Sequence, residues 1–120
     1  MNTLSVILIS IVALEHLYFL VLEMFLWTTP KGVRAFGLKS KAFAEETKVL
    51  AANQGLYNGF LAAGLIFSIV KYIVSVTVFF LICVIIAALY GAYSTKQIRL
   101  LYIQGIPAII ALTVVLLNLA

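Results

Sequence analysis

The sequence predicts an all-α integral membrane protein, a bundle of four helices in which neighbours run antiparallel. Hydrophobic residues make up 65% of the chain and charged residues only 10%, whereas about 25% of the residues in water-soluble domains are charged. Four apolar runs each approach the roughly 20 residues that a helix needs to cross a hydrocarbon core. Because little chain lies between these runs, we expect a single membrane domain over residues 1–120 and no soluble domain.

The four expected spans follow one another closely along the chain. They cover about residues 3–27, 49–70, 73–93 and 100–119, and the short connections force neighbouring helices to run antiparallel. The first run does not resemble a cleaved signal peptide, because no Lys or Arg precedes it and both Glu15 and His16 interrupt it.

The loop between the first two spans carries signals of a short helix. Thr29 can cap a helix, Pro30 suits the first helical position, and Gly37 can end one. With Val33 and Phe36 beside basic side chains, the segment resembles a helix lying in the headgroup layer. An ordinary solvated basic loop is the alternative, because the segment is too short for a clear periodicity.

The distribution of basic residues predicts the orientation. Seven of the eight Lys and Arg residues lie in or beside the first and third loops, whereas the second connection has only Lys71. The seven are Lys31, Arg34, Lys39, Lys41, Lys48, Lys96 and Arg99. Positive side chains are retained on the cytoplasmic side of a membrane. We therefore expect a multi-pass protein of the bacterial cytoplasmic membrane, with both termini outside and the first and third loops in the cytoplasm.

Three ionisable residues interrupt the first span. They are Glu15, His16 and Glu23, and a charged side chain near the middle of a membrane helix costs about 2.5 to 3.5 kcal/mol on insertion scales. His16 and Glu23 are nearly two helical turns apart, so they share one stripe of the helix. Because such residues mark functional sites by default, we take all three as candidates for acid–base or binding roles.

The second span concentrates hydrogen-bonding side chains. Asn53, Gln54, Tyr57 and Asn58 fall within six residues, and the spacing of four pairs Asn53 with Tyr57 and Gln54 with Asn58. The same helix carries a ridge of small residues at steps of four, which predicts close packing against another helix. The ridge consists of Ala51, Gly55, Gly59 and Ala63.

The third and fourth spans add a few polar groups. Tyr90 lies in the third span and Gln104 in the fourth. Pro107 lacks an amide hydrogen, so it should kink the fourth helix or free a carbonyl near Ile103. On a rise of about 1.5 Å per residue, Tyr90 and Gln104 lie at the depth of Glu23 on the cytoplasmic side of the midplane.

These residues together predict a polar pocket that opens to the cytoplasm and is closed by a nearly apolar outer half. Glu23, Asn53 and Gln54 share the shallower level with the residues of the later spans, and a deeper layer lies near the midplane. The predicted binding residues are Glu15, His16, Glu23, Asn53, Gln54, Tyr57, Asn58, Tyr90 and Gln104.

Two stretches resemble a widespread bacterial family of small four-span membrane proteins classified as a domain of unknown function. They are EHLYFLVLEMFLWTTPKG, residues 15–32, and ANQGLYNGFLAAGL, residues 52–65. The resemblance covers essentially the whole chain and implies a four-helix integral membrane protein. It implies no catalytic or binding role for any residue. In size and in the position of Glu15 the chain is also similar to the small multidrug transporters, but its second acid and adjacent His depart from their pattern.

The leading functional hypothesis is binding or proton-linked transport of a small polar or cationic solute by the predicted pocket. The expected partners are membrane lipid, a small-molecule or proton ligand and a second copy of the chain, because four helices are few for a complete transport path. No cofactor, metal or nucleic acid is expected, since no such motif is present. The alternatives are an intramembrane enzyme that uses Glu15, His16 or Glu23 on a lipophilic substrate, and a small structural or regulatory subunit.

Overall fold

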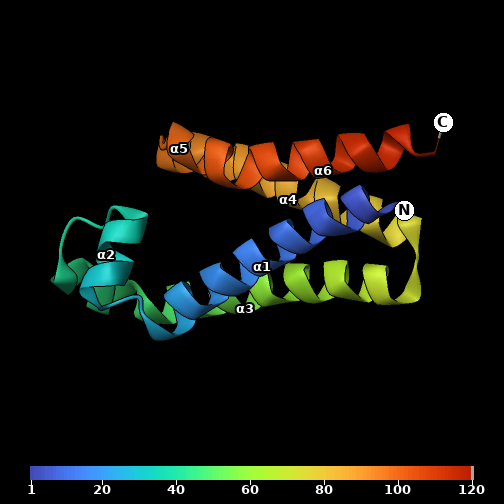
Figure 1. Ribbon diagram of the computed structural model, residues 1–120. Helices are drawn as coiled ribbons and strands as arrows, with labels where there is room; N and C mark the ends of the chain where they lie inside the picture. Colours follow the sequence, from blue (N-terminus) through green and yellow to red (C-terminus); the bar gives the residue numbers. More distant parts are fainter. Residues whose placement is uncertain (120) are drawn as a thin grey trace. The chain divides into compact units, whose positions relative to one another are not determined.

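A computed structural model describes residues 1–119, and within them every regular element is helical (Figure 1). The all-α prediction is therefore confirmed. In chain order the elements are α1 (Thr3–Phe25), α2 (Pro30–Phe36), α3 (Lys41–Lys71), α4 (Val74–Thr95), α5 (Ile98–Leu100), the π-helical turn η1 (Leu101–Gly105) and α6 (Ile106–Leu117).

Three helical segments within residues 1–119 have the length and apolar composition to cross a membrane. They are Thr3–Phe25, Val74–Thr95 and Ile98–Leu117, and they correspond to the first, third and fourth predicted spans. The predicted span over residues 49–70 lies inside α3, which begins at Lys41 and is 31 residues long. That α3 also crosses the membrane stays a prediction.

The chain divides into two compact units. The first contains Met1–Glu15 and the chain from Leu61 onward, and the second contains His16–Phe60. The first unit has the larger apolar core, in which the start of α1 and the end of α3 meet α4 and α6. Fully buried side chains form this core, among them Ile9, Val12, Leu65, Leu81, Val84 and Val115. Outward-facing groups such as Val70 and Phe79 are more than 60% exposed, which suits helices whose outer surface faces lipid.

Tight turns of one type end three helices. At each turn one residue adopts a left-handed backbone: Gly37, Tyr72 and Lys96, with φ values of 60°, 57° and 56°. After α3, the amide of Ile73 donates to the Ser68 carbonyl at 2.9 Å, which is the long bond of a Schellman motif. The same bond joins Gln97 to the Ala92 carbonyl after α4, at 3.1 Å. These motifs reverse the chain in two residues, so α4 returns antiparallel to α3 (Figure 1).

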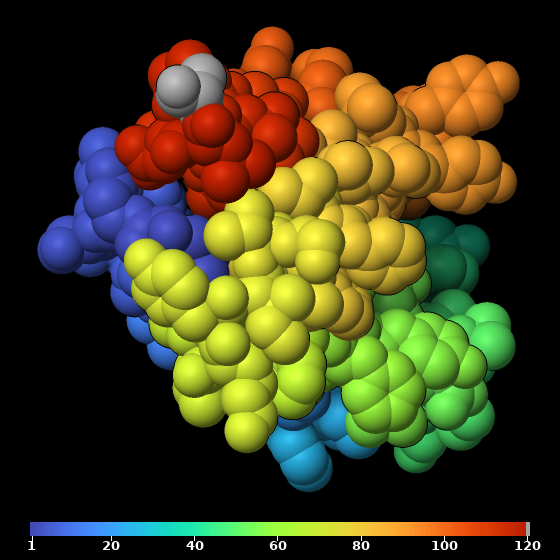
Figure 2. Space-filling view, turned by 90° about the vertical axis from the view of Figure 1, so that its right-hand side faces the viewer, coloured from blue at the N-terminus to red at the C-terminus, as the bar shows by residue number. Residues whose placement is uncertain are grey.

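Polar side chains join helix ends of the first unit near the two chain termini. Figure 2 views the molecule from this end. Asn118 donates to the Ser5 hydroxyl at 2.8 Å and accepts from Asn2 at 3.1 Å. Thr77 donates to the Ser68 hydroxyl at 2.7 Å, and Ser5, Ser68 and Thr77 are fully buried. These hydroxyls are among the few polar side chains expected in this half of the spans, and the nearly apolar outer half stays a prediction. Asn2 and Asn118 flank the apolar runs, and both bond to the Ser5 hydroxyl.

The backbone disturbance predicted before Pro107 is confirmed. Residues 101–105 form a π-helical turn, and the amide of Ile106 donates to the Leu101 carbonyl. Because Pro107 has no amide hydrogen, it cannot continue the α-helical pattern to Ile103, and the wider turn absorbs the interruption.

The short helix in the first loop is also confirmed. The Thr29 hydroxyl accepts from the amide of Gly32 at 3.3 Å, Pro30 is the first helical residue, and Gly37 caps the end of α2. Phe36 of this helix packs on Trp27 with ring centroids 4.9 Å apart. That this helix lies in the headgroup layer, and not in solvent, stays a prediction.

Candidate functional site

The most complete polar site of the second unit is centred on Glu23, in the last turns of α1. Its side chain is only 1% exposed. Oε2 accepts from Gln54 Nε2 at 2.6 Å, and Oε1 accepts from Asn58 Nδ2 at 2.5 Å. Both donors belong to α3, so two amides one helical turn apart hold the two oxygens of one carboxyl group. We call Gln54 and Asn58 the amide clamp.

The spacing of the α3 residues explains how the clamp forms. Ala51, Gln54, Gly55 and Asn58 follow the spacing i, i+3, i+4, i+7, which places them on one face of a helix. The two small residues of this face are buried. A Cβ built on Gly55 would lie 2.7 Å from Met24 Cγ and 3.0 Å from Glu23 Cβ. The absence of a side chain therefore lets the α3 backbone come close enough for short amides to reach the carboxyl group.

The predicted ridge of small residues is correct only in part. Ala51 and Gly55 are buried, and a Cβ on Gly59 would lie 2.6 Å from Leu20 Cδ1. Ala63 instead is exposed. Each step of four residues advances about 40° around a helix with 3.6 residues per turn, so the fourth ridge position has turned roughly 120° from the first. Ala62, which is fully buried, takes the inward position.

The clamp suits a carboxyl group that gains and loses a proton. The ion pair found within residues 1–119 joins Lys48 to Glu45 at 3.2 Å, and Glu23 has amide partners in place of a cation. A carboxylate only accepts hydrogen bonds, whereas a protonated carboxyl group also donates one. Each amide carries a donor and an acceptor, so a half-turn of one amide would let it accept from protonated Glu23. The same residues can therefore satisfy both charge states.

The predicted buried stripe on α1 is present. His16, Phe19 and Glu23 all point to the buried side of the helix, and His16 is fully buried. The His16 ring meets the Phe19 ring edge-on, with centroids 5.3 Å apart. Both rings belong to the second unit.

Two predicted site residues of α3 lie outside the clamp. Asn53 is exposed and Tyr57 is 63% exposed, and the Tyr57 ring lies 6.1 Å from that of Phe60. They occupy the neighbouring face of α3, as their spacing of four residues requires. Their role in binding stays a prediction.

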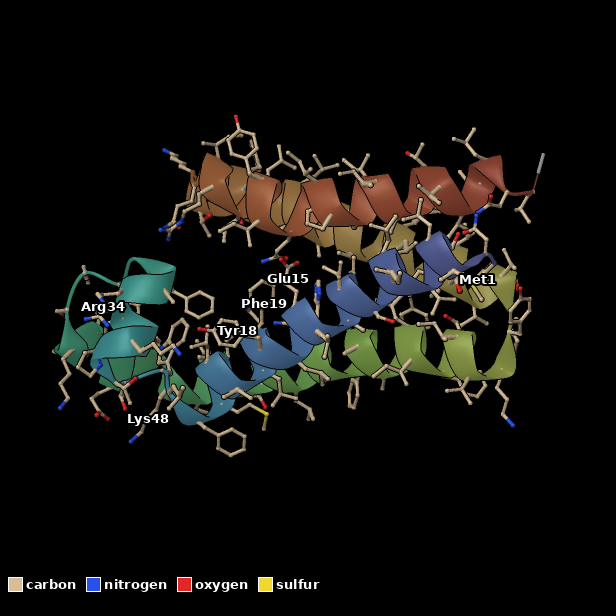
Figure 3. The ribbon with its side chains drawn as sticks, in the orientation of Figure 1. Met1, Glu15, Tyr18, Phe19, Arg34 and Lys48 are labelled. Carbon is tan, nitrogen blue, oxygen red and sulfur yellow. The ribbon has the colours of Figure 1, made fainter. Side chains whose placement is uncertain are left out.

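The other predicted site residues belong to the first unit. Glu15 is partly buried, and its Oε1 is buried without a hydrogen-bond partner among the described residues. Figure 3 shows that the side chains of Glu15 and Phe19, four residues apart, leave α1 on the same side. Tyr90 is 68% exposed, and Gln104 lies partly buried in η1. Their grouping with Glu23 in one pocket stays a prediction.

Within residues 1–119, no three His, Cys, Asp or Glu side chains are grouped to hold a metal ion.

Two side-chain pairs of the second unit were missed by sequence reasoning. Trp27 Nε1 donates to the Thr47 hydroxyl at 3.0 Å. Tyr18 is directed toward α2 (Figure 3), and Lys31 Nζ lies 5.3 Å from the centre of its ring. No spacing rule connects residues so distant along the chain, so only the packing of α1, α2, α3 and their connections within the second unit reveals these pairs.

Comparison with known proteins places the chain in a family. Residues 10–116 match the family described as "Protein of unknown function (DUF1304)". The chain belongs to this family. It is also 34% identical over 115 residues to the uncharacterized protein YpaA of Lactococcus lactis, an alignment that covers 93% of this chain and 96% of YpaA. No solved structure matches the chain. The DUF1304 match includes Glu23 and both residues of the clamp, and it confirms the family resemblance that the sequence indicated.

Proposed function

We propose that this DUF1304 protein binds or transports a small polar or cationic solute at the bacterial cytoplasmic membrane, with proton exchange at Glu23. The observation that carries the proposal is the amide clamp. It provides a buried carboxyl group with partners that can serve either charge state.

The residue types favour exchange over simple packing. An ionisable side chain in a membrane helix is costly and marks a functional site by default. Gln at position 23 would fit the same space and bond to the same amides without carrying a charge. A Glu in this place therefore favours a site that holds a proton at one time and a charge, or a bound cation, at another.

The position of Glu23 supports access from one side. It lies two residues before α1 ends at Phe25, next to the first loop. The basic residues of that loop favour the cytoplasmic side, so a proton or cation would reach the carboxyl group from the cytoplasm over a short distance. For a path to the far side we expect a homodimer, because one chain has few helices.

A packing role for Glu23 is the rival function, and one observation favours it. Both carboxyl oxygens already have partners within the chain, and interhelical hydrogen bonds in membranes contribute about 0.6 to 2 kcal/mol without any ligand. A structural subunit would need nothing more from this site.

Proton flux in proteoliposomes distinguishes the two functions. Vesicles that contain the protein and an internal pH-sensitive dye would be challenged with inorganic cations and small amines. We expect at least one solute to drive proton movement through the wild type and through Thr113→Val, an exposed position outside the predicted site, and none to do so through Glu23→Gln. Circular dichroism and size exclusion would show that the variants are folded. Equal flux through wild type and Glu23→Gln, or no flux with any solute, would favour the packing role.

A further inference from the structure

A hollow of about 440 Å³ lies at the end of α4, within the first unit. It is lined by Leu89, Ala92, Tyr93, Lys96, Ile98 and Leu101. The last turns of α4 form one wall, and the chain that continues through α5 into η1 forms the other. Ligand sites in proteins commonly have volumes of about 300 to 1,000 Å³, so the hollow is large enough to hold part of a small molecule.

The lining of the hollow is amphipathic. Leu89, Ala92, Ile98 and Leu101 are apolar, whereas Tyr93 and Lys96 carry the polar groups. Tyr93 is 81% exposed and Lys96 is exposed, so the phenol and the ammonium group are both available to a ligand. A molecule that fits this lining has an apolar chain and an anionic group.

The charge of Lys96 lacks a counter-ion in this part of the chain. Residues 61–119 contain three Lys and Arg residues and no Asp or Glu. The sequence therefore offers no carboxylate from α4, α5 or α6 to balance Lys96. An anion from outside the chain is the complementary partner.

The surrounding helices specify which kind of anion this is. The hollow lies at the end of one helix that is long and apolar enough to cross a membrane and at the start of another. At that position the hydrocarbon of a bilayer gives way to headgroups, where phosphates of anionic lipids attract Lys side chains. We infer that the hollow binds one anionic phospholipid, with an acyl chain along the apolar lining and the phosphate on Lys96 and Tyr93.

The inference can be tested by lipid retention in native mass spectrometry. The purified protein would be incubated with phosphatidylglycerol or phosphatidylcholine in detergent. Lys96 has a left-handed backbone with φ 56°, and Asn tolerates that conformation, so Lys96→Asn removes the charge without straining the turn. We expect Lys96→Asn to lower phosphatidylglycerol retention about fivefold, the effect of one Lys near an anionic lipid surface.

Three controls make the test specific. Lys71→Gln removes an exposed Lys at the end of α3, beside the start of α4, and should retain the lipid as the wild type does. Lys96→Arg should also retain it, and Leu89→Trp, which fills the hollow, should lose it. Equal retention by Lys96→Asn and the wild type would overturn the inference, as would equal retention of phosphatidylcholine. Equal binding of glycerol phosphate would show a site for free anions instead of lipid.

Discussion

Asn58 donates its side-chain amide to Glu23 at 2.5 Å, across the contact between α1 and α3. Gln54 does the same for the second carboxyl oxygen at 2.6 Å. The pair fixes the register of the two helices in the second unit, since a shift of one residue in α3 would turn both amides away from the carboxyl group.

Loss of one amide of the clamp should destabilise the protein. In Asn58→Ala the Oε1 atom of buried Glu23 loses its partner, and an unsatisfied buried polar group costs about 1 to 3 kcal/mol. We expect the free energy of unfolding in detergent to fall by this amount, as measured by denaturant titration followed by circular dichroism. Asn53→Ala, at an exposed position on the same helix, should change it by less than about 0.5 kcal/mol. Equal effects at the two positions would show that the clamp does not stabilise the fold.

Adding a methyl group should have opposite effects at two glycines. In Gly55→Ala the new Cβ would lie 2.7 Å from Met24 Cγ, and such overpacking costs about 1 to 3 kcal/mol. In Gly91→Ala the nearest atom is Leu100 Cδ1 at 4.0 Å, so the better helix propensity of Ala should stabilise α4 by about 0.5 to 1 kcal/mol. Melting temperatures in one detergent would test both. A tolerated Gly55→Ala would contradict the close approach of α3 to α1.

The buried hydroxyls of the first unit should stabilise it more than exposed hydroxyls do. Thr77→Val removes the donor to Ser68 at a fully buried site, and we expect a loss of about 0.6 to 2 kcal/mol. Thr113 is exposed and donates only to the Ile109 carbonyl of its own helix. Thr113→Val is therefore the matched control and should have little effect on thermal unfolding. A larger effect at Thr113 than at Thr77 would count against this network.

The fold was largely predictable because apolar runs long enough to span a membrane directly indicate membrane helices. The predicted limits of the first and third spans agree with α1 and α4 to within two residues. The start of α3 was missed because residues 41–48 are largely polar and a count of apolar residues does not register them. A local signal was present there: the Ser40 hydroxyl accepts from the amide of Phe43 at 3.0 Å, which is the hydrogen bond of an N-cap.

The site was predictable in its residue types and only partly in its pairing. The sequence indicated Glu23, Gln54 and Asn58 as polar groups of facing spans, but it treated Asn53 and Tyr57 as equal candidates. Gln54 and Asn58 share a helix face with small residues, and small residues mark the side of closest approach to another helix. This pattern could have distinguished Gln54 and Asn58 from Asn53 and Tyr57. The bond from Trp27 to Thr47 had no such signal, because it depends on how the turn after α1 packs on α3.

Infrared difference spectroscopy of the protein in lipid, recorded while the pH is changed, tests proton exchange at Glu23 most directly. A protonated carboxyl group has a carbonyl band distinct from those of carboxylates and amides. We expect such a band to appear and vanish with pH in the wild type and to shift in Asn58→Ala. In Glu15→Gln the band due to Glu23 should remain. In Glu23→Gln, any band that changes with pH should be the one due to Glu15. Once that contribution is subtracted, no pH-dependent carbonyl band should remain. A spectrum for Glu23→Gln that matches the wild type at every pH would contradict the account.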